Sequence, residues 1–380
     1  MVDAKEVARR ARLRLSSPKD PGFTRKALST KSKDTGRKWS YYDKKGSQIK
    51  AAKVIGRIDG LAIPPAWKDV WICSNERGSI QATGKDAKGR TQYRYHSDWV
   101  AMVSLMKFDR IMIFARNLPA VRRHYRKDMD MAGGHDPKAD GFMMPKQKVI
   151  ALVIALMDKY HIRVGNDEYA RKNKSYGLTT IKEGHMEHVK GAAAEGRHDA
   201  VFKFMGKSGK EWNITIEEDD LVDLIIESGR VGDCNKEQDL FRYDVVNEDG
   251  SKSKQNNDIK SGHINEYLSS AAWGLKVTAK DFRTWYATWK AASLLGPIPK
   301  PSSERESKRM AKDAIEKVSK HLVNTPAVCR SSYIHPAVLA DHADGSLRES
   351  WATAHSKRAV ALLSKDESTA LHYLEARFDL

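Results

Sequence analysis

The feature that most constrains the fold is a change of hydrophobic pattern near residue 100. Before it, residues 22–99 contain short runs of β-branched and aromatic residues, such as residues 70–73 and 92–95. Turn sequences with Gly, Asn or Asp separate these runs, which predicts a meandering antiparallel sheet. Two prolines exclude residues 63–67 from a helix or a central strand, because each removes a backbone donor.

After residue 100 the pattern becomes mainly helical. The apolar residues from Val149 to Tyr160 recur at i, i+3 and i+4 spacing, which predicts a helix with one apolar face. Ser303 and Glu306 form a capping box at the start of a later helix. Between these helices we expect a small group of strands at residues 178–181, 186–189, 201–205 and 212–216, and we expect an exposed loop at residues 247–261.

The sequence therefore predicts an α+β protein with two folded domains. A chain of 380 residues is about two to three times the usual length of one domain. We expect a basic N-terminal arm at residues 1–20, a small antiparallel β-rich domain at residues 21–105, and a larger, mainly α-helical domain with a small sheet at residues 106–380. Asp3 and Glu6 disfavour a cleaved transit peptide at the start of the arm.

The charge balance points to a polyanionic partner. The chain has 67 Lys and Arg against 49 Asp and Glu, a formal charge of +18, and residues 1–50 alone hold 15 Lys or Arg against 5 Asp or Glu. Nucleic acid is the commonest such partner. The rival partner is an anionic membrane surface, but the sequence has no apolar run of about 18 residues that could span a bilayer.

Cysteine content and motifs exclude several classes of protein. Cys73, Cys234 and Cys329 are too few and too scattered for a disulfide framework or a zinc cluster, which indicates a reducing, cytoplasmic compartment. The sequence has no Gly-rich loop ending in Lys-Ser/Thr, no His-Glu-x-x-His and no Gly-x-Ser-x-Gly. We therefore expect no nucleotide cofactor and no metal.

Several segments resemble the type IB DNA topoisomerases, especially their compact bacterial and poxviral branch. The likeness runs from about residue 21 to residue 336. Each segment alone is a weak signal, but together they follow the order of the family. The densest matches are LAIPPAW (61–67), GRTQYRYH (89–96), residues 162–180, FMGKSGK (204–210), KDFRTW (280–285), NTP (324–326) and RSSY (330–333).

The resemblance implies a set of catalytic residues. It makes Tyr333 the nucleophile that forms a 3′-phosphotyrosyl link, Lys207 the general acid for the departing 5′ oxygen, and Arg163, Arg283 and Asn324 the donors to the phosphate. An Arg fork stays protonated and can bind phosphate through two parallel hydrogen bonds. Such donors stabilise the negative charge that grows on the non-bridging oxygens, each commonly by about 10²–10³ in rate.

One catalytic position separates branches of the family. Nuclear and poxviral members carry His where this chain has Asn324, as bacterial-type members do. Asn can donate a hydrogen bond to a non-bridging oxygen, but it cannot act as an acid or a base near neutral pH. The resemblance therefore implies no proton transfer at this position.

The same resemblance implies the partner and its contacts. The β-rich and helical domains are expected to close on duplex DNA as a C-shaped clamp, with Gln92, Tyr93, Tyr95 and Tyr169 contacting the DNA. No external energy source such as ATP is expected, because one phosphoester replaces another of similar energy. The protein is also expected to be a monomer that uses no metal ion.

Two alternatives use similar residues. A tyrosine recombinase has a related Arg, Lys, Arg, Tyr set, but it typically carries His two residues before its second Arg, where this chain has Asp281. It also usually has a Gly-His pair where this chain has Val323 and Asn324. The other alternative is a DNA-binding protein that has lost the chemistry, yet each catalytic position of the family holds a competent residue.

Overall fold

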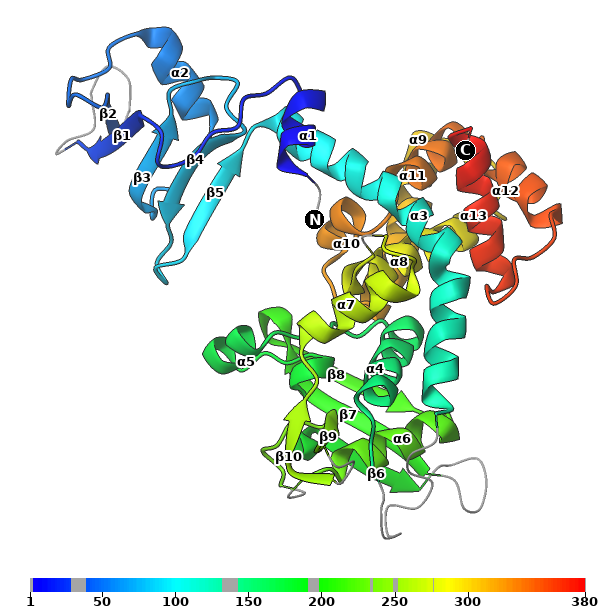
Figure 1. Ribbon diagram of the computed structural model, residues 1–380. Coiled ribbons are helices and arrows are strands. Elements are labelled where there is room, and N and C mark those ends of the chain that lie inside the picture. Colours follow the sequence, from blue (N-terminus) through cyan, green and yellow to red (C-terminus); the bar gives the residue numbers. More distant parts are fainter. Residues whose placement is uncertain are drawn as a thin grey trace. The chain divides into compact units, whose positions relative to one another are not determined.

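The chain divides into two compact units, Met1–Arg110 and Ile111–Leu380. A computed structural model gives the architecture shown in Figure 1. The elements are mostly helices, together with small antiparallel sheets, and this confirms the predicted α+β class. The residues that the structure describes are 3–28, 39–131, 143–190, 198–232, 235–248, 252–275 and 277–379.

The first unit is built on one antiparallel sheet with the strand order β2-β1-β3-β4-β5. Its strands are β1 (Gly22–Ala27), β2 (Trp39–Tyr42), β3 (Lys68–Cys73), β4 (Ile80–Lys85) and β5 (Thr91–Tyr95). Helix α2 (Ala52–Gly60) lies within the region predicted to be β-rich, and the sequence analysis missed it. Ile55 and Ile58 are one turn apart on this helix and pack against the sheet residues Val70 and Ile72.

The N-terminal segment is attached to this sheet. Helix α1 (Ala4–Arg10) begins at the N-cap Asp3, whose side chain accepts from the N–H of Lys5. Beyond it, Arg14 forms a parallel bridge with Gly78. The Ser16 hydroxyl donates to the Ile80 carbonyl (2.9 Å) and accepts from the Ile80 N–H (2.8 Å). These bonds connect the basic segment to the start of β4.

The second unit consists mainly of helices around a buried central one. Helix α3 (Ser97–Met129) begins in the first unit and continues into the second. The predicted helix at Val149–Tyr160 is α4 (Lys146–Tyr160), and it is buried on all sides, because alanines and isoleucines fill its other faces. The remaining helices are α5 (Asp167–Asn173), α6 (Asp219–Gly229), α7 (Ser261–Ala271), α8 (Ala279–Leu295), α9 (Glu304–His321), α10 (Pro326–Ser332), α11 (Pro336–Asp344), α12 (Leu347–Ser356) and α13 (Lys365–Arg377).

A three-stranded antiparallel sheet in this unit has the order β6-β7-β8. Strands β7 (His198–Gly206) and β8 (Lys210–Ile216) form a hairpin, and β6 (Met186–Lys190) pairs with β7. The strand predicted at residues 178–181 is wrong. Leu178–Thr180 is a 3₁₀ turn, in which the N–H of Thr180 donates to the Gly177 carbonyl (2.8 Å).

The loop predicted at residues 247–261 is also wrong in its central part. Strand β10 (Lys252–Asp258) pairs with β9 (Arg242–Val246) in a two-stranded sheet. The sequence of β10 is polar and has little strand propensity, so pairing with β9 rather than local preference decides its conformation.

Buried ion pairs fix the C-terminal helices to the core. Arg122 on α3 pairs with Asp158 on α4 (2.7 Å) and with Glu367 on α13 (2.9 Å). The Tyr373 hydroxyl on α13 donates to Asp341 on α11 (2.8 Å). Helix α11, which follows the predicted nucleophile, is therefore tied to α13, and α13 is tied to α3.

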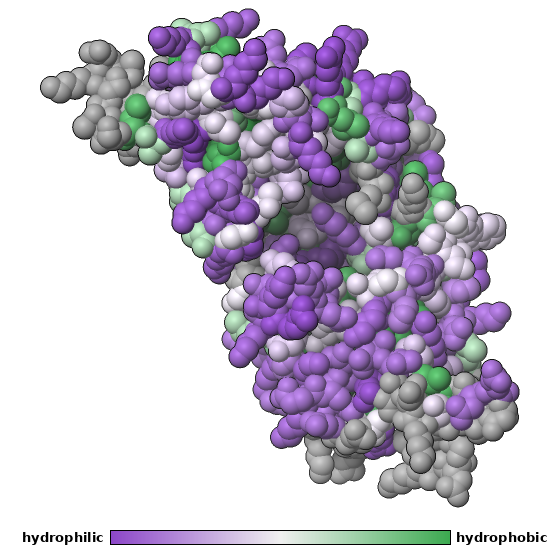
Figure 2. All heavy atoms as spheres, turned by 60° about the vertical axis from the view of Figure 1, so that its left-hand side comes forward, coloured by the Kyte–Doolittle hydropathy of each residue, from purple (hydrophilic) through white to green (hydrophobic). Residues whose placement is uncertain are grey.

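Hydrophilic side chains cover most of the face shown in Figure 2, and hydrophobic ones form small separate patches. Cys73 and Cys329 are free thiols, and Cys234 lies outside the described residues. None of the described helices is both long enough and apolar enough to cross a lipid bilayer.

Candidate active site

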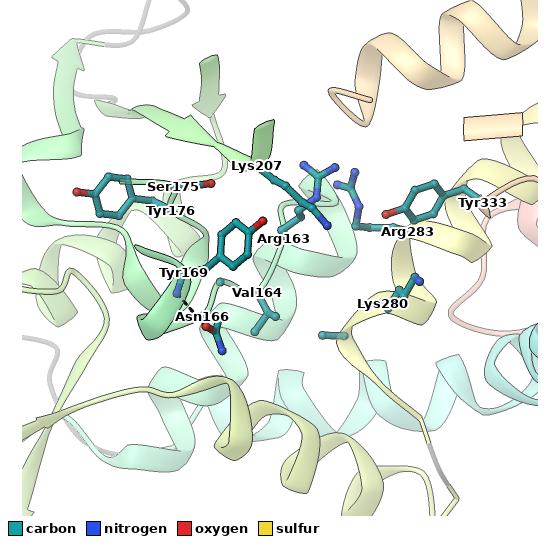
Figure 3. Close-up of a pocket in the computed structure, with 12 residues that line it drawn as sticks. Arg163, Val164, Asn166, Tyr169, Ser175, Tyr176, Lys207, Lys280, Arg283 and Tyr333 are labelled. Carbon is teal, nitrogen blue, oxygen red and sulfur yellow. Dashed lines mark hydrogen bonds between the residues drawn. The ribbon is translucent and has the colours of Figure 1, made fainter. Parts of the chain in front are cut away.

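One cavity in the second unit brings together residues that lie far apart in the sequence. Its volume is about 350 Å³. Figure 3 shows the side chains around it. The lining residues are Arg163, Val164, Gly165, Asn166, Tyr169, Ser175, Tyr176, Lys207, Ala279, Lys280, Arg283 and Tyr333. Four of the five residues expected to act in catalysis thus share this cavity.

Arg163 is placed by the end of helix α4. His161 ends this helix in the left-handed conformation (φ 56°) and turns the chain toward the cavity. The N–H of Leu178 then donates to the Arg163 carbonyl (2.9 Å). The two segments approach so closely that a Cβ on Gly177 would lie 2.5 Å from the same carbonyl oxygen, so this position requires glycine.

Arg163 also contacts the fifth predicted catalytic residue. Its guanidinium donates to the Oδ1 of Asn324. Asn324 follows α9, where its own N–H donates to the Ser319 carbonyl (3.0 Å). Asn324 does not line the cavity itself, but it is hydrogen-bonded to Arg163, which does.

Arg283 is almost fully buried, with 3% of its surface exposed. Its guanidinium donates to two main-chain carbonyls, those of His161 and Leu322 (2.7 Å to Leu322). These carbonyls belong to the C-caps of α4 and α9, where the helix dipole places partial negative charge. Burial and the nearby Arg163 lower the pKa of Arg283 to about 10, so the side chain stays protonated at neutral pH.

Three buried donors of the predicted catalytic residues have no acceptor among the described residues. They are Nη1 of Arg163, Nε of Arg283 and Nδ2 of Asn324. A buried donor without a partner costs about 1–3 kcal/mol, so a cluster of three is unfavourable unless a ligand supplies the acceptors. An anion with several oxygens, such as a phosphodiester, has the required chemistry.

Tyr333 lies directly after helix α10, with its hydroxyl pointing toward Arg283 (Figure 3). The Arg283 guanidinium carbon is 5.4 Å from the centre of the Tyr333 ring. Burial raises the pKa of the hydroxyl, but the charges of Arg283, Arg163 and Lys280 outweigh burial and lower it below its usual value of 10. The tyrosinate therefore forms more readily here than in water.

The main chain of Tyr333 is held by its neighbours. Its N–H donates to the Cys329 carbonyl (3.0 Å), and its carbonyl accepts from the Thr288 hydroxyl on α8 (3.2 Å). Because Arg283 is on the same helix as Thr288, one rigid element positions both the cation and the hydroxyl.

Lys207 begins the short turn between β7 and β8, as the predicted hairpin tip requires. Its side chain is exposed and extends toward Arg163 and Arg283 (Figure 3). The preceding residue, Gly206, packs on the indole of Trp212, which also lies 5.9 Å from the Arg283 guanidinium. Trp212 thus contacts both the hairpin tip and the buried arginine.

The residues predicted to contact DNA fall in both units. Tyr169 is on α5, is 44% exposed and lines the cavity. Gln92, Tyr93 and Tyr95 are on β5 in the first unit, where the two tyrosine rings stack with their centres 5.8 Å apart. The Gln92 amide is already engaged, because it donates to Asp86 (2.9 Å).

Sequence reasoning missed Lys280 as a member of the site. It lies one helical turn before Arg283, lines the cavity and helps to lower the pKa of Tyr333. The spacing of three residues from Arg283 would be a usable signal once this segment is known to be helical, because residues three apart on a helix share a face. Trp212 carried no such signal, since its contact with Arg283 depends on tertiary packing.

Comparisons with known proteins cover most of the chain. Residues 96–359 match the family model described as "Eukaryotic DNA topoisomerase I, catalytic core", and residues 38–86 match "Bacterial DNA topoisomerase IB, N-terminal domain". The chain is similar to a DNA topoisomerase 1B of Acanthamoeba polyphaga mimivirus, with 30% identity over 308 residues. This alignment spans 79% of the chain and 83% of the relative.

Proposed function

The chain belongs to the type IB DNA topoisomerases, and we propose that it relaxes supercoiled duplex DNA through a covalent link between Tyr333 and a 3′ phosphate, without ATP or a metal ion. The observation that carries this proposal is that Nη1 of Arg163 and Nε of Arg283, which line the same cavity as Tyr333, are buried donors with no acceptor among the described residues. A phosphodiester that enters the cavity supplies the acceptors that these donors lack.

The reaction exchanges one phosphoester for another. The Tyr333 oxygen attacks the phosphorus, its proton passes to solvent, and the bond from phosphorus to the 5′ oxygen breaks. Lys207 gives a proton to that departing oxygen and leaves a free 5′ hydroxyl. After the DNA has rotated, the hydroxyl attacks the phosphotyrosine and the same steps run in reverse.

The two arginines stabilise the charge on the non-bridging oxygens. Support comes from the burial of Arg283 and of the Nη1 atom of Arg163, because donors in a low dielectric interact more strongly than they would in water. Arg283 has carbonyl partners, so its hydrogen bonds leave its formal charge uncompensated.

Asn324 serves as a further donor to the phosphate. Its Oδ1 accepts from Arg163, and its Nδ2 group is a buried donor that has no acceptor among the described residues. An amide has no proton to give or take near neutral pH, so Asn324 contributes binding and orientation only.

The remaining features are consistent with a bacterial-type enzyme. Asn324 and the match to the bacterial N-terminal domain support that branch. We propose that Gln92, Tyr93, Tyr95 and Tyr169 contact the duplex, and that the protein acts on DNA of the cytoplasmic nucleoid. We also propose that it works as a monomer.

A plasmid assay tests this function. Purified protein is mixed with negatively supercoiled plasmid in EDTA and without ATP, and the distribution of linking numbers is followed on a gel. We expect full relaxation. A tyrosine recombinase would act only on paired specific sites, and a protein that merely binds DNA would leave the linking number unchanged, so either result would overturn the proposal.

Gly206→Ala should slow DNA cleavage without weakening DNA binding. The added Cβ would lie 2.5 Å from the indole of Trp212, so the tip of the hairpin has to move. A displacement of about 1 Å can cost about 10²-fold in rate when it misplaces a reacting group. We expect a loss of that size in the single-turnover cleavage rate, because Lys207 is the next residue.

Gly262→Ala is the matched control for this variant. Gly262 is in the same unit, near the start of α7, and an added Cβ there meets nothing within 4 Å. The control should cleave at the wild-type rate. Wild-type cleavage by Gly206→Ala would show that the hairpin tip does not need its packing on Trp212.

A further inference from the structure

Two histidines outside the cavity are linked to each other and, through nearby main-chain carbonyls, to Arg283. The imidazoles of His161 and His321 are joined directly, with Nδ1 of His161 and Nε2 of His321 2.9 Å apart. The main-chain carbonyl of His161 and that of Leu322, the residue after His321, both accept from the Arg283 guanidinium. The two histidines and Arg283 therefore form one ring of contacts: the imidazoles bond to each other, and the guanidinium bonds to the carbonyls of His161 and Leu322.

A tyrosine on the same helix as Arg283 covers this pair. The Tyr286 ring lies 3.9 Å from the His161 ring and 4.4 Å from the His321 ring, measured between ring centres. Tyr286 is one helical turn beyond Arg283 on α8. The three rings therefore join the end of α4, the end of α9 and α8, and each of these elements carries or adjoins a proposed catalytic residue.

Both imidazoles are suited to a bond between neutral rings. Burial lowers the pKa of His161 well below its usual value, and His321 and Arg283 add to this effect. Burial also lowers the pKa of His321, with further contributions from Arg283 and Lys290. Two neutral imidazoles can share one N–H···N hydrogen bond, in which one ring donates and the other accepts.

We propose that His161 and His321 are positioning residues for catalysis, because their mutual hydrogen bond fixes the separation of the two carbonyls that hold Arg283 against the phosphate site. This inference rests on the proposed role of Arg283. Neither histidine lines the cavity, and the ring nitrogens Nδ1 of His161 and Nε2 of His321 face each other rather than the phosphate site. Their effect reaches the reaction through the guanidinium alone.

The two histidines differ in exposure, and this makes the inference testable. His161 is buried, so its replacement would disturb the core. His321 is the last residue of α9 and keeps part of its surface exposed, so its replacement should cost less stability than that of His161. His321→Leu keeps an apolar side chain of similar size but cannot accept or donate the bond, whereas His321→Gln keeps a polar atom near the position of Nε2.

The experiment measures three quantities for each variant: the single-turnover cleavage rate at saturating protein, the Kd for intact duplex, and the melting temperature. A neutral hydrogen bond of ordinary strength corresponds to about a fivefold change in rate. We expect His321→Leu to cleave about 5–10-fold more slowly, with Kd and melting temperature close to wild type. His321→Gln should recover most of the rate.

Lys317→Leu and Arg283→Ala complete the set. Lys317 is exposed and lies one turn earlier on α9. The Lys317→Leu variant should cleave at the wild-type rate at saturating protein. Wild-type cleavage by His321→Leu, or equal defects in His321→Leu and His321→Gln, would overturn the positioning role. If Arg283→Ala is slow in the same experiment, the proposed site is still supported. Full activity of Arg283→Ala would overturn the site and this inference together.

Discussion

Tyr333→Phe abolishes relaxation and covalent cleavage, while non-covalent binding to duplex DNA stays within a few-fold of wild type: this is the largest effect that we expect. The substitution removes one oxygen and keeps the ring that lies 5.4 Å from the Arg283 guanidinium. Both main-chain hydrogen bonds of residue 333 remain possible. Loss of a nucleophile should reduce the rate by at least about 10⁴-fold.

The measurement is the yield of protein covalently joined to a nicked substrate that cannot be resealed, read on a denaturing gel. Tyr243→Phe is a suitable control, because it makes the same chemical change on β9 in the same unit, away from the cavity. Clear covalent product from Tyr333→Phe would transfer the role of nucleophile to another residue.

Lys207→Ala should reduce cleavage of ordinary DNA by about 10²–10⁴-fold, the range for a lost general acid. An alkoxide is a poor leaving group, so the 5′ oxygen needs a proton as its bond to phosphorus breaks. If sulfur replaces this bridging oxygen, the thiolate leaves without a proton. Lys207→Ala should then cleave the 5′-thio substrate at nearly the wild-type rate.

The arginines provide the contrast in this experiment. Arg163→Ala and Arg283→Ala lose donors to the non-bridging oxygens, which sulfur at the bridging position does not replace. Their rates should recover at most in part. Lys210→Ala, at the other end of the same turn, tests whether any lysine of the hairpin has this effect. Equal defects of Lys207→Ala on both substrates would rule out a general acid at this position.

Local sequence patterns predicted those parts of the fold that local interactions decide. Ser303 caps the start of α9, where its hydroxyl accepts from the Glu306 N–H (3.2 Å), although the Glu306 carboxylate accepts from Ser302 and so does not complete the predicted capping box. The Gly-containing turn after Gly206 closes the β7–β8 hairpin. Two of the failures have a common cause. The conformations of α2 and β10 depend on a partner elsewhere in the fold, the sheet for α2 and β9 for β10.

The candidate site divides in the same way. Tyr333, Lys207 and the two arginines were named because their segments follow the order of a family, and no spacing along the chain predicts that they meet. The bond between His161 and His321 joins residues that are distant in the sequence, and packing of α4 and α9 against α8 brings them together. Contacts of this kind depend on tertiary packing, which local sequence patterns do not predict.

The carbonyl partners of Arg283 have a consequence for how dissolved ions affect the enzyme. Mobile ions screen charges in contact with solvent, but they have little access to a guanidinium enclosed between two helix ends. Ionic strength should therefore act on the two stages of the reaction differently. Added salt should weaken the binding affinity for the duplex, which depends on exposed lysines and arginines. It should have little effect on the rate of cleavage once the phosphate is bound, because ions do not screen the charge of Arg283 there.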